Sequence, residues 1–277
     1  MSAMGEQSSA QGWHAQLHLT FARRAARTCI VERQHRGPLL VQRPFYPEGD
    51  VCHAYIVHPP GGVVGGDDLR LQIQARDEAH ALLTTPAAAK FYRSDGRTAR
   101  QNQTLRADDT TLEWLPQESI FYPQANVRST TRIELTSRAK FIGWEIACLG
   151  LPARQQPFDD GELRLHLELW ADGSPLLIDR LRISGADHHR GSRSGLGGHE
   201  AIGTLLAYPA TSAMVDAARG LQQSGVEIGV TLVDKVLVCR ALAAQGEPIK
   251  RAFIASWQTL RPQLLDRPAV LPRIWAT

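Results

Sequence analysis

The sequence predicts a mainly β protein with a many-stranded antiparallel or mixed architecture, either β-helical or built of layered sheets. It also predicts about two helices in the C-terminal third. Two observations indicate this fold class. Apolar and polar residues alternate along most of the chain, which is the pattern of half-buried strands. Apolar residues recur at helical spacing in two segments, and both segments lie in the C-terminal third.

The predicted strands are stretches in which every second residue is apolar. In Leu163–Leu169, four leucines alternate with polar residues. A period of two turns one set of side chains to the core and the other set to solvent. Asp172 and Gly173 lie between two such stretches and predict a hairpin turn. The same alternation marks Leu17–Phe21, Leu69–Ala75, Arg132–Leu135, Leu176–Ile183 and Val226–Leu237.

The two predicted helices follow these strands. Ser212–Gln223 carries apolar residues at helical spacing and stops before Gly225, a residue typical of helix ends. Pro248–Leu265 carries a second apolar stripe. Proline is tolerated in a first helical turn, whereas Pro262 is expected to end or bend this helix.

We expect residues 1–277 to form one domain. Residues 1–12 are polar and expected to be disordered. Residues 185–198 are rich in Gly, Ser, His and Arg, which predicts a flexible loop. Long predicted strands lie on both sides of this loop, so we interpret it as an excursion within the domain.

The composition points to a cytoplasmic protein. The net charge of +3 gives no electrostatic reason to expect nucleic acid or an anionic membrane as the partner. Met1–Trp13 lacks the apolar core of a signal peptide, and no apolar run approaches the ~20 residues of a membrane span. The cysteines form no C-x-x-C pair, which favours reduced, mostly buried thiols over a zinc site. They are Cys29, Cys52, Cys148 and Cys239.

A glycine-rich segment, His58–Asp67, is the first candidate for function. It lacks the Lys-Ser/Thr ending of a P-loop and the spacing of a dinucleotide fingerprint, so phosphate binding is not expected. A tight loop between strands is the simpler interpretation. That interpretation does not explain why His58 and Asp67 bracket the glycines, and bare backbone beside ionisable groups can also form a polar passage or a docking surface.

Glu118 is a second candidate because it follows Pro116 in an otherwise apolar run. A buried lone carboxylate is costly unless it is paired or binds a cation. A solvent-facing Glu118 is the competing interpretation, since most glutamates are exposed.

Histidines near carboxylates form a third candidate, with His188, His189 and His199 close to Asp187 and Glu200. Such a cluster suits nickel or zinc, and a nickel storage or sensor protein is one hypothesis. A surface loop without metal is the other. No complete zincin or G-x-S-x-G pattern is present here, and we expect no enzymatic activity.

The C-terminus is apolar to its end. Ile274 and Trp275 would waste apolar area if they were exposed. The tail therefore either folds back onto the body or docks on a partner.

Five stretches, taken together, resemble the urease accessory protein family UreD, called UreH in some bacteria. They span almost the whole chain in the order of the family. The stretches are Pro38–Gly49, His58–Asp67, Leu83–Ser94, Leu115–Phe121 and Leu260–Thr277.

The resemblance implies a mostly β protein with a few helices that is not an enzyme. It implies binding to the accessory protein UreF, through UreF to the GTPase UreG, and docking of the assembly on apo-urease. Nickel would then pass through the protein into the urease active site, as a transient ion and not as a tightly bound cofactor. A pure docking scaffold without nickel contact is the alternative.

Carried onto this sequence, the family motifs place Asp67, Glu118 and, by a weaker match, Glu145 on a hydrated nickel path, with His58 nearby. Oxygen donors hold Ni²⁺ less tightly than imidazole or thiolate clusters do, which suits transit. The C-terminal segment is expected to take part in the UreF interface or to brace it. Its candidate residues are Phe253, Trp257, Leu260, Ile274 and Trp275.

Overall fold

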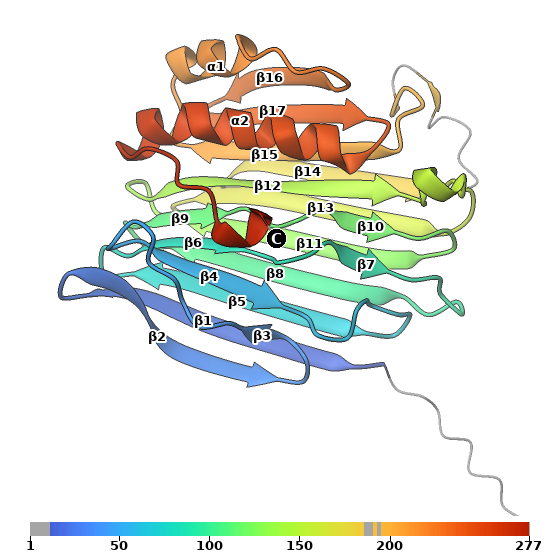
Figure 1. The fold of residues 1–277 in the computed structure, drawn as a ribbon, viewed down its shortest axis with the longest axis horizontal. Coiled ribbons are helices and arrows are strands. Elements are labelled where there is room, and N and C mark those ends of the chain that lie inside the picture. The colour runs from blue at the N-terminus through green and yellow to red at the C-terminus, as the bar shows by residue number, and fades with distance from the viewer. Residues whose placement is uncertain (1–11, 186–190, 193–194, 277) are drawn as a thin grey trace, which may run out of the picture.

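The computed structural model describes residues 12–185, 191–192 and 195–276. In this part of the chain, the strands form two sheets that pack face to face, and both α-helices lie on the outer side of one sheet (Figure 1). Residues 1–11 of the expected disordered segment 1–12 lie outside the described residues, as do residues 186–190 and 193–194 of the expected loop 185–198, and with them His188 and His189.

Seven of the described strands form the sheet that carries no helix. Its five central strands run parallel, and an antiparallel strand closes each edge. In spatial order they are β14 (Ser174–Ser184), β13 (Glu162–Ala171), β11 (Asn126–Leu135), β8 (Ala99–Ala107), β5 (Asp68–Arg76), β1 (His14–Arg24) and β2 (Arg27–Arg36).

Ten described strands form the second sheet, which the helices cover. The main path is β16 (Glu227–Val233), β17 (Val236–Ala243), β15 (Ala201–Tyr208), β12 (Lys140–Leu149), β9 (Thr111–Trp114), β6 (His80–Thr84), β4 (Cys52–Val57) and β3 (Leu40–Val41). Off this path, β10 (Ser119–Phe121) pairs with both β12 and β7 (Ala89–Phe91).

From β5 to β13 the chain winds as a parallel coil that alternates between the two sheets. Asp68 pairs with Arg100, Arg100 with Arg128, and Arg128 with Arg164, so successive turns of the coil take 32, 28 and 36 residues. The mixed, many-stranded β architecture is confirmed, and the coiled part has the β-helical form.

Alternation explains why these segments are strands. Along β5, Leu69, Leu71, Ile73 and Ala75 are buried between the sheets, and the residues between them face outward. The predicted hairpin is also confirmed, since Asp172 and Gly173 adopt φ angles of 47° and 76° and join β13 to β14.

The helices α1 (Ser212–Arg219) and α2 (Gly246–Leu265) confirm the two predicted positions with corrected ends. The helix α1 starts where the Thr211 side chain accepts a hydrogen bond from the Met214 N–H, and it ends four residues before Gln223. Pro262 does not end α2, because it lies in the last turn and its carbonyl accepts the Asp266 N–H. No helix in the described chain has the length and apolar character needed to cross a membrane.

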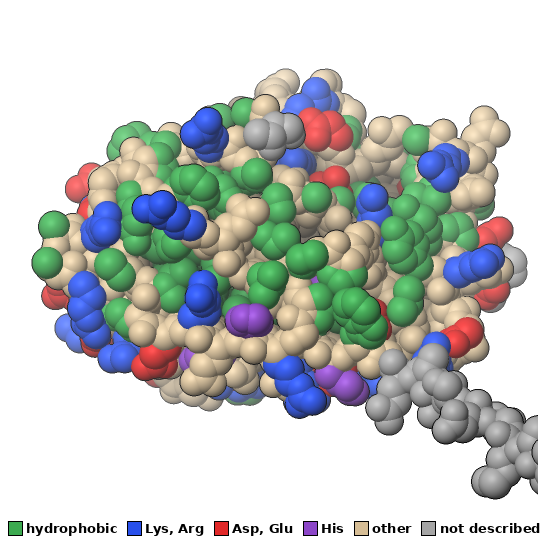
Figure 2. All heavy atoms as spheres, turned by 60° about the horizontal axis from the view of Figure 1, so that its bottom comes forward, with side chains coloured by type: hydrophobic (Ala, Val, Ile, Leu, Met, Phe, Trp, Pro, Cys, Tyr) green, Lys and Arg blue, Asp and Glu red, His purple; other side chains and the backbone are tan. Residues whose placement is uncertain are grey.

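A second apolar core lies between α2 and the ten-stranded sheet. The helix approaches β15 closely at Gly203, where an added Cβ would come within 2.6 Å of Ile249 and 2.7 Å of Phe253. Beyond α2 the chain crosses the ten-stranded sheet and ends in a short 3-10 turn, Arg273–Ala276; a second such turn is Pro152–Arg154 (Figure 1). Figure 2 shows the molecule with the β2 edge turned toward the viewer. This surface has apolar side chains in its middle and basic side chains around them.

Candidate functional site

A cavity of about 810 Å³ lies between the two sheets and is the candidate functional site. Most inward positions are apolar, but one row in each sheet is interrupted by polar residues. In the seven-stranded sheet, Gln103 and Thr131 share a row with Asp179. In the ten-stranded sheet, Glu145 shares a row with Thr204. Such a lining gives water the polar partners that it needs inside a protein.

Glu145 lies on β12 with its carboxylate turned toward the seven-stranded sheet, where it accepts a hydrogen bond from the Thr131 hydroxyl. Burial raises the pKa of Glu145 from 4.5 to about 7, and the negative charge of Asp179 adds to this rise. Near neutral pH this carboxyl therefore exchanges its proton readily, and an arriving cation can displace that proton.

Asp179 stands at the edge of the cavity on β14. Its carboxylate pairs with Arg240 of β17 at 2.7 Å, which links the edge strand of one sheet to the second strand of the other. Both side chains keep contact with solvent, with 27% of Asp179 and 53% of Arg240 exposed. The cavity thus carries a carboxylate in its interior and a second one where water reaches it.

His58 and the glycine-rich segment form another part of the cavity wall, together with Pro59, Gly61 and Gly62. Burial lowers the pKa of His58, and the charge of Asp67 opposes this effect. The lowered pKa keeps the imidazole neutral at pH 7, which is the form that ligates metal ions.

Asp67 lies outside the cavity wall, contrary to the expectation that it lines the path. It is 5% exposed, and its two carboxylate oxygens accept the backbone N–H groups of Trp13 and Val64 at 2.8 and 2.9 Å. Asp67 therefore fixes the shape of the glycine-rich segment behind His58. Any direct part in metal transfer stays a prediction.

Glu118 also lies off the cavity, on the helix-covered face of the ten-stranded sheet. Its side chain approaches Gly246 in the first turn of α2, and its charge helps burial to raise the pKa of Cys148 to about 12. One oxygen, Oε2, is buried without a hydrogen-bond partner among the described residues. This position favours an interaction with the positive end of the α2 dipole over contact with the cavity.

The C-terminal tail folds back onto the body. Trp275 packs against Trp144 and Trp257 with ring centroids 5.8 and 6.1 Å apart, and it donates a hydrogen bond to Thr84. Three side chains of α2 are fully buried: Phe253, Trp257 and Leu260. These three side chains brace the segment from inside, and the half-buried Ile274 and Trp275 lie nearer its surface. Its part in partner binding stays a prediction.

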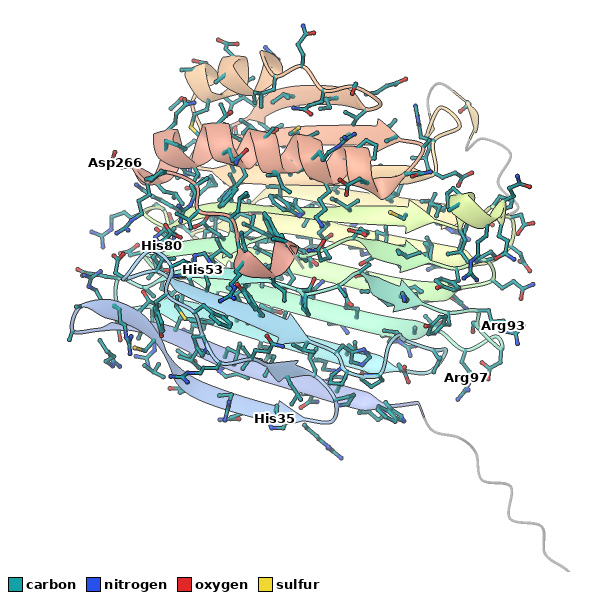
Figure 3. All side chains as sticks on the ribbon, in the orientation of Figure 1. His35, His53, His80, Arg93, Arg97 and Asp266 are labelled. Atoms are coloured by element: carbon teal, nitrogen blue, oxygen red, sulfur yellow. The ribbon has the colours of Figure 1, made fainter. Side chains whose placement is uncertain are left out.

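A buried charge network fastens α2 to the ten-stranded sheet, and no local pattern in the sequence predicts it. The Arg261 guanidinium lies 3.0 Å from the Glu113 carboxylate and 2.9 Å from that of Glu48. His80 and His53 lie 2.7 Å from Glu113 and Glu48, respectively. His53 and His80 come from neighbouring strands and lie close together below the end of α2 (Figure 3).

Attractive contacts outweigh the cost of burying the Glu113 carboxylate in this network. Burial alone would raise the pKa of Glu113, but its hydrogen bonds and charge interactions with His80 and Arg261 outweigh that effect and lower the pKa from 4.5 to about 2. Trp257 donates a further hydrogen bond to Glu113 at 2.7 Å. The network thus holds the C-terminal helix in one position on the sheet.

No group of three or more His, Cys, Asp or Glu side chains is placed to hold a metal ion in the part of the chain that the structure describes. His199, the member of the predicted histidine cluster that is described, lies 3.3 Å from Glu227. The four cysteines are free thiols, three of them buried, as expected.

These features define a scaffold: two coiled sheets that enclose a mainly apolar cavity with a few polar side chains, and a C-terminal helix fastened across one of them. The family model for the UreD urease accessory protein matches residues 14–276. The chain belongs to this family, and its role therefore lies in urease maturation.

Curated relatives match this chain over nearly their full lengths. The urease accessory protein UreD of Citrobacter koseri is 44% identical over 100% of this chain and 96% of its own length. Those of Alcanivorax borkumensis and Klebsiella aerogenes are 44% and 43% identical over 96% of this chain. The alignments include 93% and 98% of the lengths of these two relatives.

Proposed function

We propose that this chain is a non-enzymatic cytoplasmic scaffold that guides Ni²⁺ through the cavity between its sheets into apo-urease, in a complex with UreF and the GTPase UreG. The observation that carries the proposal is the position of Glu145 inside the cavity with Asp179 at its edge. The family supplies the link to urease.

The donors of the cavity suit a passing ion. Carboxylate oxygens bind Ni²⁺ less tightly than clusters of imidazole or thiolate, so each contact is easily exchanged for the next. Glu145, with a pKa of about 7, takes up a proton when the cation leaves, which limits the charge left in the interior. His58 offers a neutral nitrogen at another part of the wall.

A pure docking scaffold is the second candidate. The observation that favours it is the position of Asp67 and Glu118, two of the predicted path carboxylates, away from the cavity wall. In this case the cavity is a by-product of the coil, and the urease partners use only the surface.

The two candidates differ in what the cavity carboxylates do. Urease should be produced with UreF, UreG and either the wild-type chain or the Glu145→Gln, Asp179→Asn double variant. Glu134→Gln, on the outer face of the same scaffold, is the control. We expect the double variant to copurify with its partners while nickel per urease falls several-fold. Normal nickel content with the double variant would leave docking as the function.

A further inference from the structure

The exposed face of the seven-stranded sheet carries a row of arginines, of which only Arg182 also borders the cavity. Arg100 of β8 is the register neighbour of Arg128 of β11. Arg128 is the neighbour of Arg164 of β13, and Arg164 is the neighbour of Arg182 of β14. Arg100 and Arg128 are exposed, and 40% of the Arg164 side chain and 68% of the Arg182 side chain are exposed. We refer to these four side chains as the arginine row.

The arginine row is not neutralised by its own surroundings. Glu162 is 2.6 Å from Arg164 and 3.3 Å from Arg182, and its pKa is lowered by the hydrogen bond to Arg164 and by the nearby charges of Arg182 and Arg128. One carboxylate thus serves three guanidinium groups. On its other side, Arg100 is the register neighbour of Asp68, whose carboxylate pairs with Arg70 at 2.8 Å. Arg100 forms no ion pair with a described residue, so the row retains a positive excess.

The other end of the same face shows a different arrangement. There Arg106 and Arg132 both lie 2.5 Å from Glu134, and Arg132 also reaches Glu168 at 3.3 Å. The Arg132 guanidinium covers the Trp170 ring at 4.2 Å. The sheet therefore pairs its arginines at this end and leaves them in excess at the other.

The arginine row does not serve the stability of the fold. Like charges directly opposite one another on neighbouring strands are destabilising. Both helices lie on the other sheet, so no helix of the described chain covers the row (Figure 1). A contiguous basic surface of this kind attracts and orients an acidic partner.

The spacing of the row favours an acidic helix as the occupant. Neighbouring strands lie about 4.8 Å apart, which sets the step between successive arginines. The Cβ atoms of acidic residues at positions i and i+4 of a helix are about 5–6 Å apart, close to this step. Alternate residues of an extended strand are about 6.6 Å apart and match it less well.

We propose that the arginine row docks an acidic helical surface of apo-urease. This inference rests on the proposed role in urease maturation and adds the face and the chemistry of contact. Guanidinium groups suit contact with an acidic surface because they bind carboxylates in a bidentate manner.

The test compares two triple variants on the same face of the full-length protein. Arg100→Gln, Arg128→Gln, Arg164→Gln removes the row, whereas Arg76→Gln, Arg106→Gln, Arg132→Gln removes three ion-paired arginines elsewhere on that face. Binding of purified apo-urease to the immobilised chain is measured at about 50 mM and about 300 mM NaCl, because exposed charge contacts weaken with salt.

We expect the row variant to bind apo-urease roughly tenfold or more weakly at low salt, since three exposed ion pairs are lost. The control variant should stay within about threefold of wild type, and the salt dependence should shrink in the row variant alone. Thermal unfolding of the row variant should occur at or above the wild-type temperature, because repulsion is removed.

Two results would overturn the inference and leave the proposed function intact. The first is equal binding of apo-urease by the wild type and the row variant. The second is that the wild type binds a random-sequence DNA duplex and the row variant does not, while both bind apo-urease equally. Failure of the wild type to bind apo-urease would count against the proposed function, and this inference would fall with it.

Discussion

Replacing Arg261 with methionine tests whether the buried charge network holds the C-terminal helix. Arg261 is 0% exposed and contacts both Glu113 and Glu48. The variant would leave two buried carboxylates without their guanidinium partner. Breaking a buried ion pair in this way costs about 3–5 kcal/mol of the free energy of unfolding. The pKa of Glu113, lowered from 4.5 to about 2, implies a similar figure of about 3 kcal/mol.

Urea and thermal unfolding measure this loss directly. For a chain of this size we expect Arg261→Met to lower the melting temperature by roughly 6–20 °C. Arg267→Met is the matched control, because Arg267 pairs with Asp50 at 2.6 Å but is 37% exposed. An exposed pair contributes about 0–1 kcal/mol, so the control should change little.

The contribution of Glu113 to the free energy of unfolding depends on pH. The pKa of Glu113 is lower in the folded than in the unfolded chain, so its ionised form stabilises the fold above pH 4.5. This contribution is lost as the pH falls from 4.5 toward 2, and the gap between wild type and Arg261→Met should narrow over that range. Equal stability of Arg261→Met and Arg267→Met at pH 7 would show that the buried network does not hold the helix.

Three further substitutions probe the cavity, the tail and the helix contact. Glu145→Gln should stabilise the protein by about 1–3 kcal/mol at pH 8 and should have no effect at pH 4, because the raised pKa of Glu145 makes its ionised form costly above pH 7. Equal urea midpoints of the variant and the wild type at pH 8 would contradict this. Trp275→Ala should lower the free energy of unfolding by about 1–3 kcal/mol through its ring contacts, and an unchanged melting temperature would show that the tail is not bound. Gly203→Val should destabilise by about 1–3 kcal/mol because its Cβ meets Ile249, and native stability would argue against the close helix contact.

The strands could be predicted from the sequence because alternation is a local signal. Leu163–Leu169 and the Asp172–Gly173 turn needed no knowledge of the rest of the chain. The coil could not be predicted in the same way, since its parallel partners lie 28 to 36 residues apart and its turns share no repeated motif. Pairing at that distance leaves no periodic trace when each turn has its own length.

The site was only partly accessible to sequence reasoning. Asp179 and Gln103 stand at inward positions of alternating strands, and a polar residue at such a position is the signal that could have located the cavity. The family motifs place Asp67 and Glu118 on the path, but a position in a motif says nothing about the direction of the side chain. The Arg261–Glu113 pair joins residues 148 positions apart, and charged residues are ordinarily assumed to be exposed.

The most direct test of the central claim is to fill the cavity and measure nickel in urease. Ser129 lines the cavity, whereas the next residue, Thr130, points to the outer face of the same strand. Ser129→Trp places a large ring in the path, and Thr130→Trp places the same ring outside it. With partner binding retained in both, we expect nickel-poor urease for Ser129→Trp and normal urease for Thr130→Trp. Fully loaded urease matured with Ser129→Trp would contradict passage through the cavity.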